Sequence, residues 1–188
     1  TLTTAFRLFN GEGDGFGGIT IDWYENYLVI SWYNETIYSF KDEIIGYIES
    51  VLPNVFGIYE KVRFKSDSLP ESQFISGKQA PEPLIVKENG INYATYLDEG
   101  LMTGIFLDQK EVRGALASGL ATNRTLLNTF SYTGAFSVAA AMGGSLETTS
   151  VDLAKRSLEK TQEQFQVKSL DVDNQRIIVM DVFNYLKY

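Results

Sequence analysis

Short apolar segments that alternate with helical segments dominate the second half of the chain and limit the folds open to it. Thr125–Phe130, Thr148–Val151 and Arg176–Met180 have the length and composition of strands. Between them lie the alanine-rich Ala135–Met142, which ends at a glycine pair, and the amphipathic Ala154–Phe165. Strands that alternate with helices of this length predict βαβ units and a parallel sheet. We therefore predict an α/β fold class for the chain.

The first half of the chain has a mixed pattern without this alternation. Ile19–Tyr24 and Tyr27–Tyr33 are strand-like and only two polar residues apart, which predicts a tight hairpin. The apolar spacing in Ile44–Leu52 predicts a helix, and the prolines of Lys65–Pro83 predict an exposed connection. Other predicted elements are a strand at Val55–Phe64, a hairpin of Leu84–Lys87 and Ile91–Tyr96 around Asn89-Gly90, and a helix at Glu111–Leu120. We place a domain boundary near residue 100, with an accessory α/β domain over residues 1–100 and a second domain over residues 101–188.

The chain contains neither cysteine nor histidine, which excludes several kinds of chemistry within its 188 residues. There is no disulfide, no thiol nucleophile, no imidazole acid or base and no thiolate or imidazole ligand for zinc. We predict no metal site. No apolar run approaches the length of a membrane helix, and residues 1–10 lack the pattern of a signal peptide. We therefore expect a cytoplasmic protein.

The net charge is concentrated in the first half of the chain. Residues 1–100 hold 15 acidic and 7 basic side chains, whereas residues 101–188 hold 9 of each. Binding to nucleic-acid phosphates needs clustered Lys and Arg, and neither half shows such a cluster. If a nucleic acid is the substrate, its main binding surface is expected outside this chain.

A glycine-rich segment near the N-terminus formally matches a dinucleotide-binding motif. Residues 13–18, Gly-Asp-Gly-Phe-Gly-Gly, fit the pattern G-x-G-x-x-G. The functional motif needs a strand before the loop and a helix after it. Here the following residues, Ile19–Tyr24, are strand-like, so we interpret the segment as a structural turn.

Polar residues follow each predicted strand of the second half. The first strand, Thr125–Phe130, is apolar and expected to be buried, and it leads into Ser131-Tyr-Thr-Gly134 at the start of a helix. Asp152 follows the second strand, and Asp181 follows the third. In open α/β sheets, ligands bind at the carboxyl ends of the strands, beside free N–H groups at helix starts. An acidic residue about 20 positions beyond the first turn accepts hydrogen bonds from ribose hydroxyls. Each residue singly is typical of a helix cap, but the three polar ends together favour a nucleoside site.

Longer motifs surround these polar ends. They are Thr103-Gly-Ile-Phe-Leu-Asp-Gln-Lys110 and Leu127-Asn-Thr-Phe-Ser-Tyr-Thr-Gly-Ala-Phe136, with Ser150-Val-Asp152 and Asp181-Val-Phe183 after the next two strands. Together with the segment from Arg7 to Asp22, they resemble the RlmI-like family of class I rRNA methyltransferases. Members of that family resemble or include 23S rRNA cytosine-C5 methyltransferases. The resemblance covers nearly the whole chain.

The resemblance implies a fold and a cofactor. The fold is an N-terminal α+β accessory domain followed by the first half of a Rossmann-like class I methyltransferase sheet. The cofactor is S-adenosyl-L-methionine, with Asp152 at the ribose and Asp181, Val182 and Phe183 at the adenine. The remaining implied site residues are Phe130, Ser131, Tyr132, Thr133 and Gly134 around the methionine part, and Phe106, Asp108 and Gln109 closing the pocket.

The resemblance also implies a substrate and missing parts. Ribosomal RNA is the expected substrate of the full-length enzyme, and a homodimer is one assembly to test. The family's small RNA-binding PUA domain and its catalytic D-P-P-x-F segment do not occur in these residues. We therefore assign no catalytic residue and expect a fragment that holds the cofactor without completing methyl transfer.

The residues by themselves are also compatible with two other functions. An NAD- or nucleotide-dependent oxidoreductase uses a similar sheet, although Ser131–Gly134 is a poor pyrophosphate loop. A non-catalytic α/β scaffold with a vestigial pocket would bind neither cofactor. Titration with S-adenosylmethionine and with NAD separates these alternatives.

Overall fold

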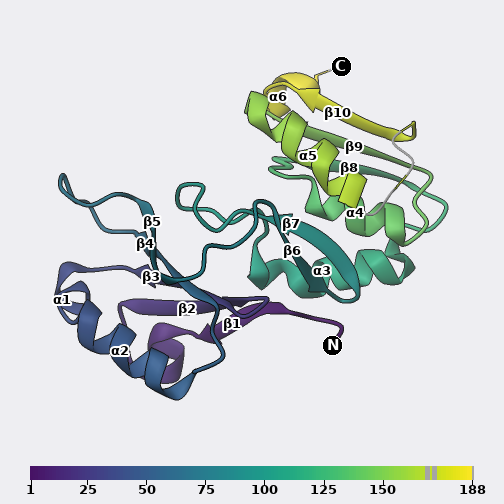
Figure 1. Cartoon of the computed structure of the whole chain (residues 1–188). Helices are drawn as coiled ribbons and strands as arrows, with labels where there is room; N and C mark the ends of the chain where they lie inside the picture. The colour runs from purple at the N-terminus through teal and green to yellow at the C-terminus, as the bar shows by residue number, and fades with distance from the viewer. Residues whose placement is uncertain (168–169, 171–172, 188) are drawn as a thin grey trace. The chain divides into compact units, whose positions relative to one another are not determined.

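The computed structural model describes residues 1–167, 170 and 173–187 and divides the chain into two compact units (Figure 1). The first unit consists mainly of Thr3–Val86 and Thr95–Thr103. The second unit consists of Lys87–Ala94 and the chain from Gly104 onward. The predicted α/β class is confirmed.

The first unit is built on a five-stranded sheet of order β1-β2-β3-β4-β5. All neighbours are antiparallel except β3 and β4, which are parallel. Ile45 and Ile48 of α2 join a buried apolar cluster with residues of β2, β3 and β4. The elements are β1 (Ala5–Phe9), β2 (Ile19–Tyr24), β3 (Tyr27–Trp32), α1 (Glu35–Tyr38), α2 (Lys41–Val51), β4 (Gly57–Val62) and β5 (Ser72–Gly77).

The hairpin predicted at β2 and β3 is confirmed. Its two turn residues have positive φ angles, 46° at Glu25 and 70° at Asn26, as in the turns that match the twist of a two-residue hairpin. The glycine-rich segment before β2 forms a 3-10 turn over Gly11–Asp14, and a strand follows it, as expected for a structural turn.

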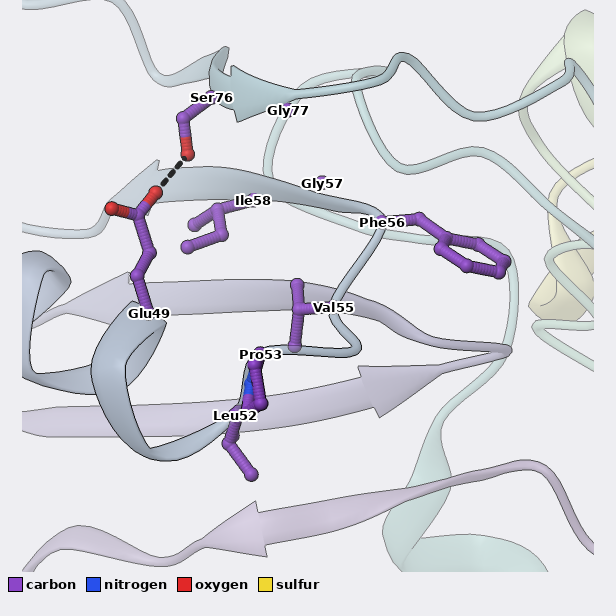
Figure 2. A pocket seen from close by; sticks show the side chains of 9 residues that line it. All are labelled: Glu49, Leu52, Pro53, Val55, Phe56, Gly57, Ile58, Ser76 and Gly77. Atoms are coloured by element: carbon purple, nitrogen blue, oxygen red, sulfur yellow. Dashed lines mark hydrogen bonds between the residues drawn. The ribbon is translucent and has the colours of Figure 1, made fainter.

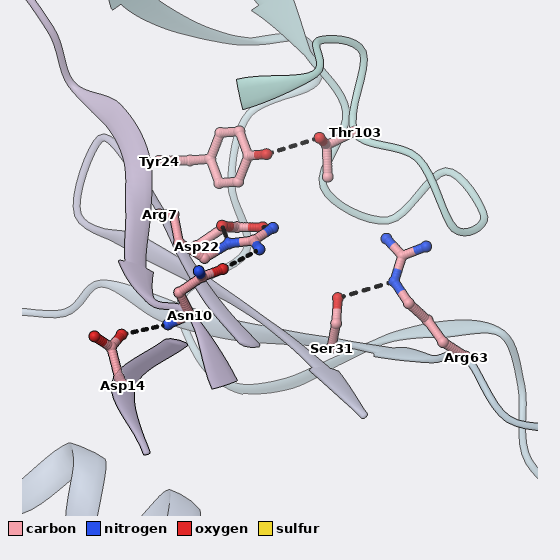
Figure 3. Close-up of polar contacts among 8 residues, drawn as sticks. All are labelled: Arg7, Asn10, Asp14, Asp22, Tyr24, Ser31, Arg63 and Thr103. Atoms are coloured by element: carbon pink, nitrogen blue, oxygen red, sulfur yellow. Dashed lines mark hydrogen bonds and ion pairs between the residues drawn. The ribbon is translucent and has the colours of Figure 1, made fainter. Parts of the chain in front are cut away.

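Buried and half-buried polar groups fix the last segment of the first unit, Thr95–Thr103. The Lys61 Nζ donates to the carbonyl oxygens of Leu97 at 2.6 Å and Gly100 at 2.5 Å. Burial lowers the pKa of this ammonium group to about 8. Figure 3 shows a second tie, in which the Tyr24 hydroxyl lies 2.8 Å from Thr103 Oγ1. These contacts thus hold Thr95–Thr103 along its length, as far as the last residue of the first unit.

The second unit contains a parallel sheet of order β10-β9-β8, as predicted. The helix predicted at Ala135–Met142 is observed with those bounds. The Ser137 hydroxyl of this helix lies 2.7 Å from the Ser150 hydroxyl of β9, and both residues are fully buried. The elements after Gly104 are α3 (Lys110–Ala115), β8 (Thr125–Thr129), α4 (Ala135–Met142), β9 (Glu147–Asp152), α5 (Lys155–Val167), β10 (Gln175–Val179) and α6 (Val182–Tyr185).

The predicted Asn-Gly hairpin is also confirmed, as β6 (Leu84–Glu88) and β7 (Ile91–Thr95), and its tip belongs to the second unit. The buried side-chain amide of Gln164 accepts from the Ala94 N–H at 2.9 Å and donates to the Ala94 carbonyl at 2.8 Å. The Gln164 side chain thus supplies Ala94 with the two backbone hydrogen bonds that a neighbouring strand would otherwise make.

Two predictions of local structure were wrong, and a third was right only in part. The exposed connection predicted at Lys65–Pro83 contains β5, which pairs along β4, and no local pattern revealed that pairing. The helix predicted at Glu111–Leu120 is observed as α3 continued by a π turn over Leu116–Leu120, and it is distorted near its end, where Gly119 has φ 105°. The strand at Thr125–Phe130, predicted to be buried, lies at an edge of the described sheet, and Leu127 is 45% exposed.

Replacing Gln164 by leucine should destabilise the second unit. The two Ala94 backbone groups would stay buried without partners, at a cost of about 2–4 kcal/mol in the free energy of unfolding. Urea unfolding followed by circular dichroism measures the change. Gln162→Leu on the exposed side of α5 is the matched control, and equal stability of both variants would contradict this account of Ala94.

Candidate functional site

Parallel pairing places the three predicted polar strand ends at one edge of the sheet. Thr129, the last residue of β8, is in register with Val151 of β9. Asp152, the last residue of β9, is in register with Val179 at the end of β10. The loop Phe130–Gly134, Asp152 and Asp181 therefore follow neighbouring strands at the carboxyl edge, where open α/β sheets bind ligands.

The loop Phe130–Gly134 has an unusual backbone. Phe130, Tyr132 and Gly134 have φ angles of 54°, 53° and 75°. The left-handed region is strained for residues other than glycine, so two such side chains in five residues need outside support. Part of that support comes from the neighbouring strand, because the Ser131 N–H donates to the carbonyl oxygen of Val151 in β9 at 3.1 Å.

Asp152 supplies the rest of the support on this side. Its Oδ2 accepts the N–H of Tyr132 at 2.9 Å, and its Oδ1 accepts the N–H of Ala154 at 2.9 Å. An ionised carboxylate has about four acceptor positions, so about two remain for a ligand hydroxyl. The residue predicted at the ribose therefore also positions the loop, a role that the sequence motif did not reveal.

Gly134 is required by its neighbour as well as by its backbone angle. A Cβ atom built on Gly134 would lie 2.4 Å from the Cγ2 of Thr161, a fully buried residue of α5. The glycine therefore lets the loop pack closely on α5. Thr161 was not among the predicted site residues, because nothing in its own sequence context indicates this contact.

Two aromatic rings stand at the ends of β8 and β10. The centroids of Phe130 and Phe183 are 6.1 Å apart with the rings tilted by 67°, and each residue is 65% exposed. Beside them Asp181 caps α6 by accepting the Asn184 N–H at 2.9 Å, and Val182 is buried. This edge offers an exposed apolar surface next to carboxylates, a combination that suits a nucleoside base.

The segment after Gly104 contacts the loop through part of its predicted residues. The Gly104 N–H donates to the Tyr132 hydroxyl at 3.0 Å, and the Thr133 hydroxyl donates to the Gly104 carbonyl at 2.6 Å. The Phe106 ring lies 5.6 Å from the Tyr132 ring. Phe106 is thus brought to the loop.

Asp108 and Gln109 are not brought to the loop in the same way. Both lie exposed in the 3-10 turn Leu107–Gln109. Within the described part of the chain, neither side chain forms a hydrogen bond or ion pair with Phe130–Gly134. Their role in closing a pocket stays a prediction.

A hollow of about 190 Å³ in the first unit involves none of the predicted site residues (Figure 2). It lies between the end of α2 and strands β4 and β5, and most of its lining residues are apolar or glycine. Glu49 and Ser76 bond to each other there at 2.7 Å. The hollow offers no arrangement of polar groups aimed at a ligand.

Neither a metal-ion site nor a membrane-spanning helix occurs in residues 1–167, 170 and 173–187. Those residues contain no cluster of three or more acidic, cysteine or histidine side chains able to hold a metal ion. They also contain no helix with the length and apolar character to cross a bilayer.

Replacing Gly134 by alanine should distort the loop. The left-handed backbone and the contact with Thr161 together should lower stability by about 2 kcal/mol or more. The probe is S-adenosylhomocysteine (SAH), which is the cofactor implied by the resemblance without its methyl group. Calorimetric titration with SAH should show weaker binding by the folded variant. Adding Thr161→Ser removes the nearest methyl group and should restore part of the loss.

Gly15→Ala in the first unit is the matched control. Gly15 also has positive φ, 85°, but a Cβ atom there would meet nothing within 4 Å. This variant should lose stability and keep its ligand affinity. A selective loss of affinity in Gly15→Ala would show that the wrong glycine segment has been assigned to the ligand.

Comparison with known proteins gives a family for this arrangement. A family model described as "S-adenosylmethionine-dependent methyltransferase" matches residues 7–187. A Bacillus subtilis (strain 168) protein, YwbD, provisionally named a ribosomal RNA large subunit methyltransferase, is 56% identical over 188 residues, which are 99% of this chain and 48% of that protein. Ribosomal RNA large subunit methyltransferase I of Pseudoalteromonas translucida (strain TAC 125) is 34% identical over 98% of this chain and 47% of its own length.

A solved structure also resembles the chain closely. A provisionally assigned methyltransferase complexed with SAH superposes with a TM-score of 0.95 and 53% identity, over 100% of this chain and 48% of the other. The chain thus spans about half the length of the relatives that it matches.

Proposed function

Because the chain belongs to the S-adenosylmethionine-dependent methyltransferase family, as an RlmI-like member, we propose that its second unit holds the cofactor at the carboxyl edge of sheet β10-β9-β8. The observation that carries this assignment is the convergence of three parallel strand ends around Asp152. The alternative of a dinucleotide enzyme is less well supported. Phe130–Gly134 has a single glycine and two residues with side chains in left-handed backbone conformations, where a pyrophosphate would need open backbone.

The described side chains fit the parts of this cofactor. Asp152 retains acceptor capacity for ribose hydroxyls, and the exposed ring of Phe183 offers an apolar surface for the adenine. Phe130, which the resemblance implies at the methionine part, is proposed to extend that adenine surface, because its ring contacts Phe183. The loop around Tyr132 would take the methionine part. Asp181, which caps α6, keeps acceptor capacity for the adenine amino group.

The chemistry fits a chain without cysteine or histidine. When bound, the cofactor supplies a methyl group made electrophilic by its sulfonium charge. The residues around it then have to bind, orient and exclude water rather than transfer protons at the sulfur. A loop held by Asp152, Val151 and Gly104 is suited to that positioning task.

We further propose that the whole protein methylates large-subunit ribosomal RNA in the cytoplasm. The names of two relatives support the RNA substrate. Cytosine C5 as the acceptor rests on the resemblance of the motifs alone. A cytosine carbon would have to be activated and the base taken out of its stack, and the assigned site residues supply neither step.

The ribose role of Asp152 is testable separately from its role in holding the loop. Asp152→Ala should weaken binding of S-adenosylhomocysteine by roughly 1.5–3 kcal/mol, as expected for hydrogen bonds to a charged group. The same titration with 2′-deoxy and 3′-deoxy analogues completes a thermodynamic cycle. If Asp152 accepts a ribose hydroxyl, a ligand without that hydroxyl should lose affinity for the unmodified chain and lose much less for Asp152→Ala. Equal losses in both proteins would show that Asp152 supports the loop and does not bind the ribose.

The 188 residues by themselves should bind cofactor without methylating RNA. They span about half of each matched relative, and the assigned site includes no group that would activate a base. Tritium transfer from labelled S-adenosylmethionine to ribosomal RNA measures turnover, with a protein of the relatives' full length as positive control. Turnover comparable to the control would show that residues assigned here to cofactor binding or structure perform the chemistry.

A further inference from the structure

A buried ion pair lies behind the candidate site. The Arg113 Nε and Nη2 atoms each donate to one carboxylate oxygen of Glu88 at 2.7 Å. Both side chains are 1% exposed. Such a bidentate pair is strong in geometry, but taking two charges out of water costs several kcal/mol per ion. Stability alone is therefore a weak reason for the pair.

Two aromatic rings lie beside the guanidinium group of Arg113. Its central carbon lies 6.0 Å from the centroid of Tyr93 and 5.5 Å from that of Phe136. Tyr93 belongs to β7, and Phe136 lies in the first turn of α4, two positions after the loop Phe130–Gly134. The ring faces attract the cation and restrict where it can lie.

The remaining contact of Arg113 leads to the site. The Nη2 atom that bonds Glu88 also donates to the Phe106 carbonyl oxygen at 2.6 Å. Phe106 is the residue whose ring meets Tyr132, two positions after the backbone contacts of Gly104. A rigid, buried fork thus connects the β6–β7 hairpin to the segment that borders the loop.

We propose that Arg113, oriented by Glu88, is a positioning residue that sets the backbone of Phe106 and so the fit of Gly104–Phe106 against the cofactor loop. The inference rests on the proposed function for its ligand, but its geometric part concerns the ligand-free chain. It assigns the β6–β7 hairpin a part in cofactor affinity although the hairpin provides no predicted site residue.

The test separates positioning from stability by removing both charges. Arg113→Met alone leaves Glu88 buried without a partner and should unfold readily. In Glu88→Met/Arg113→Met both sites become apolar, and stability should recover to within about 5 °C of the unmodified melting temperature. The Phe106 carbonyl still lacks its donor in the double variant. The dissociation constant of the double variant for S-adenosylhomocysteine should therefore be raised about tenfold.

A second readout follows Phe106 without any ligand. Incorporation of 4-fluorophenylalanine at position 106 gives a ¹⁹F signal that reports the surroundings of the ring. The signal should shift in the double variant, and also in Arg113→Lys, because an ammonium group keeps the charge but lacks the planar fork. Arg176→Met is the matched control, since Arg176 forms an exposed pair with Glu147 at 3.2 Å, and it should leave the signal and the affinity unchanged.

The outcomes are distinct. A double variant with recovered stability, unchanged affinity and an unchanged ¹⁹F signal would overturn the proposal. If the double variant does not fold, an unchanged signal in Arg113→Lys would overturn it equally. If the unmodified chain does not bind S-adenosylhomocysteine, the proposed function fails, while the ¹⁹F comparison still decides whether Arg113 positions Phe106.

Discussion

The two hydrogen bonds accepted by Asp152 are the contacts on which the candidate site depends. One, from the Tyr132 N–H, connects the end of β9 to a loop in which Phe130 and Tyr132 both have left-handed backbone angles, and the other is accepted from the Ala154 N–H just before α5. Such angles cost free energy, and they persist only where the surroundings hold them. Parallel pairing of β8 and β9 brings the carboxylate to the loop, so the sheet is a precondition of the site.

Support from the other side of the loop comes from segments distant in sequence. Gly134 packs on Thr161 of α5, and the Thr133 hydroxyl donates to the Gly104 carbonyl. The loop is therefore fixed by β9, by α5 and by the residues around Gly104, and none of these contacts uses a catalytic acid or base.

Much of this architecture could be predicted from the sequence. Helix and strand periodicity indicated the βαβ order and the two hairpins, and the motifs around Gly104 and Gly134 indicated the family and its cofactor, which are now confirmed. What failed was non-local. Strand β5 was missed because its pairing with β4 depends on a partner distant in sequence, and β8 was judged buried from its composition although no strand covers one of its edges in the described sheet.

The contacts inside the site were the least predictable part. The sequence motif indicated that Asp152 lies near a ribose, but its bonds to Tyr132 and Ala154 depend on how two strands align. Glu88 appeared only as a residue beside an Asn-Gly turn, and its pairing with Arg113 closes a gap of 25 positions. A methyl donor carries its own reactivity, so such a protein needs accurate placement more than proton transfer. Placement is achieved by buried bonds among residues far apart in the chain, and for this reason the cofactor could be inferred from the motifs while its supports could not.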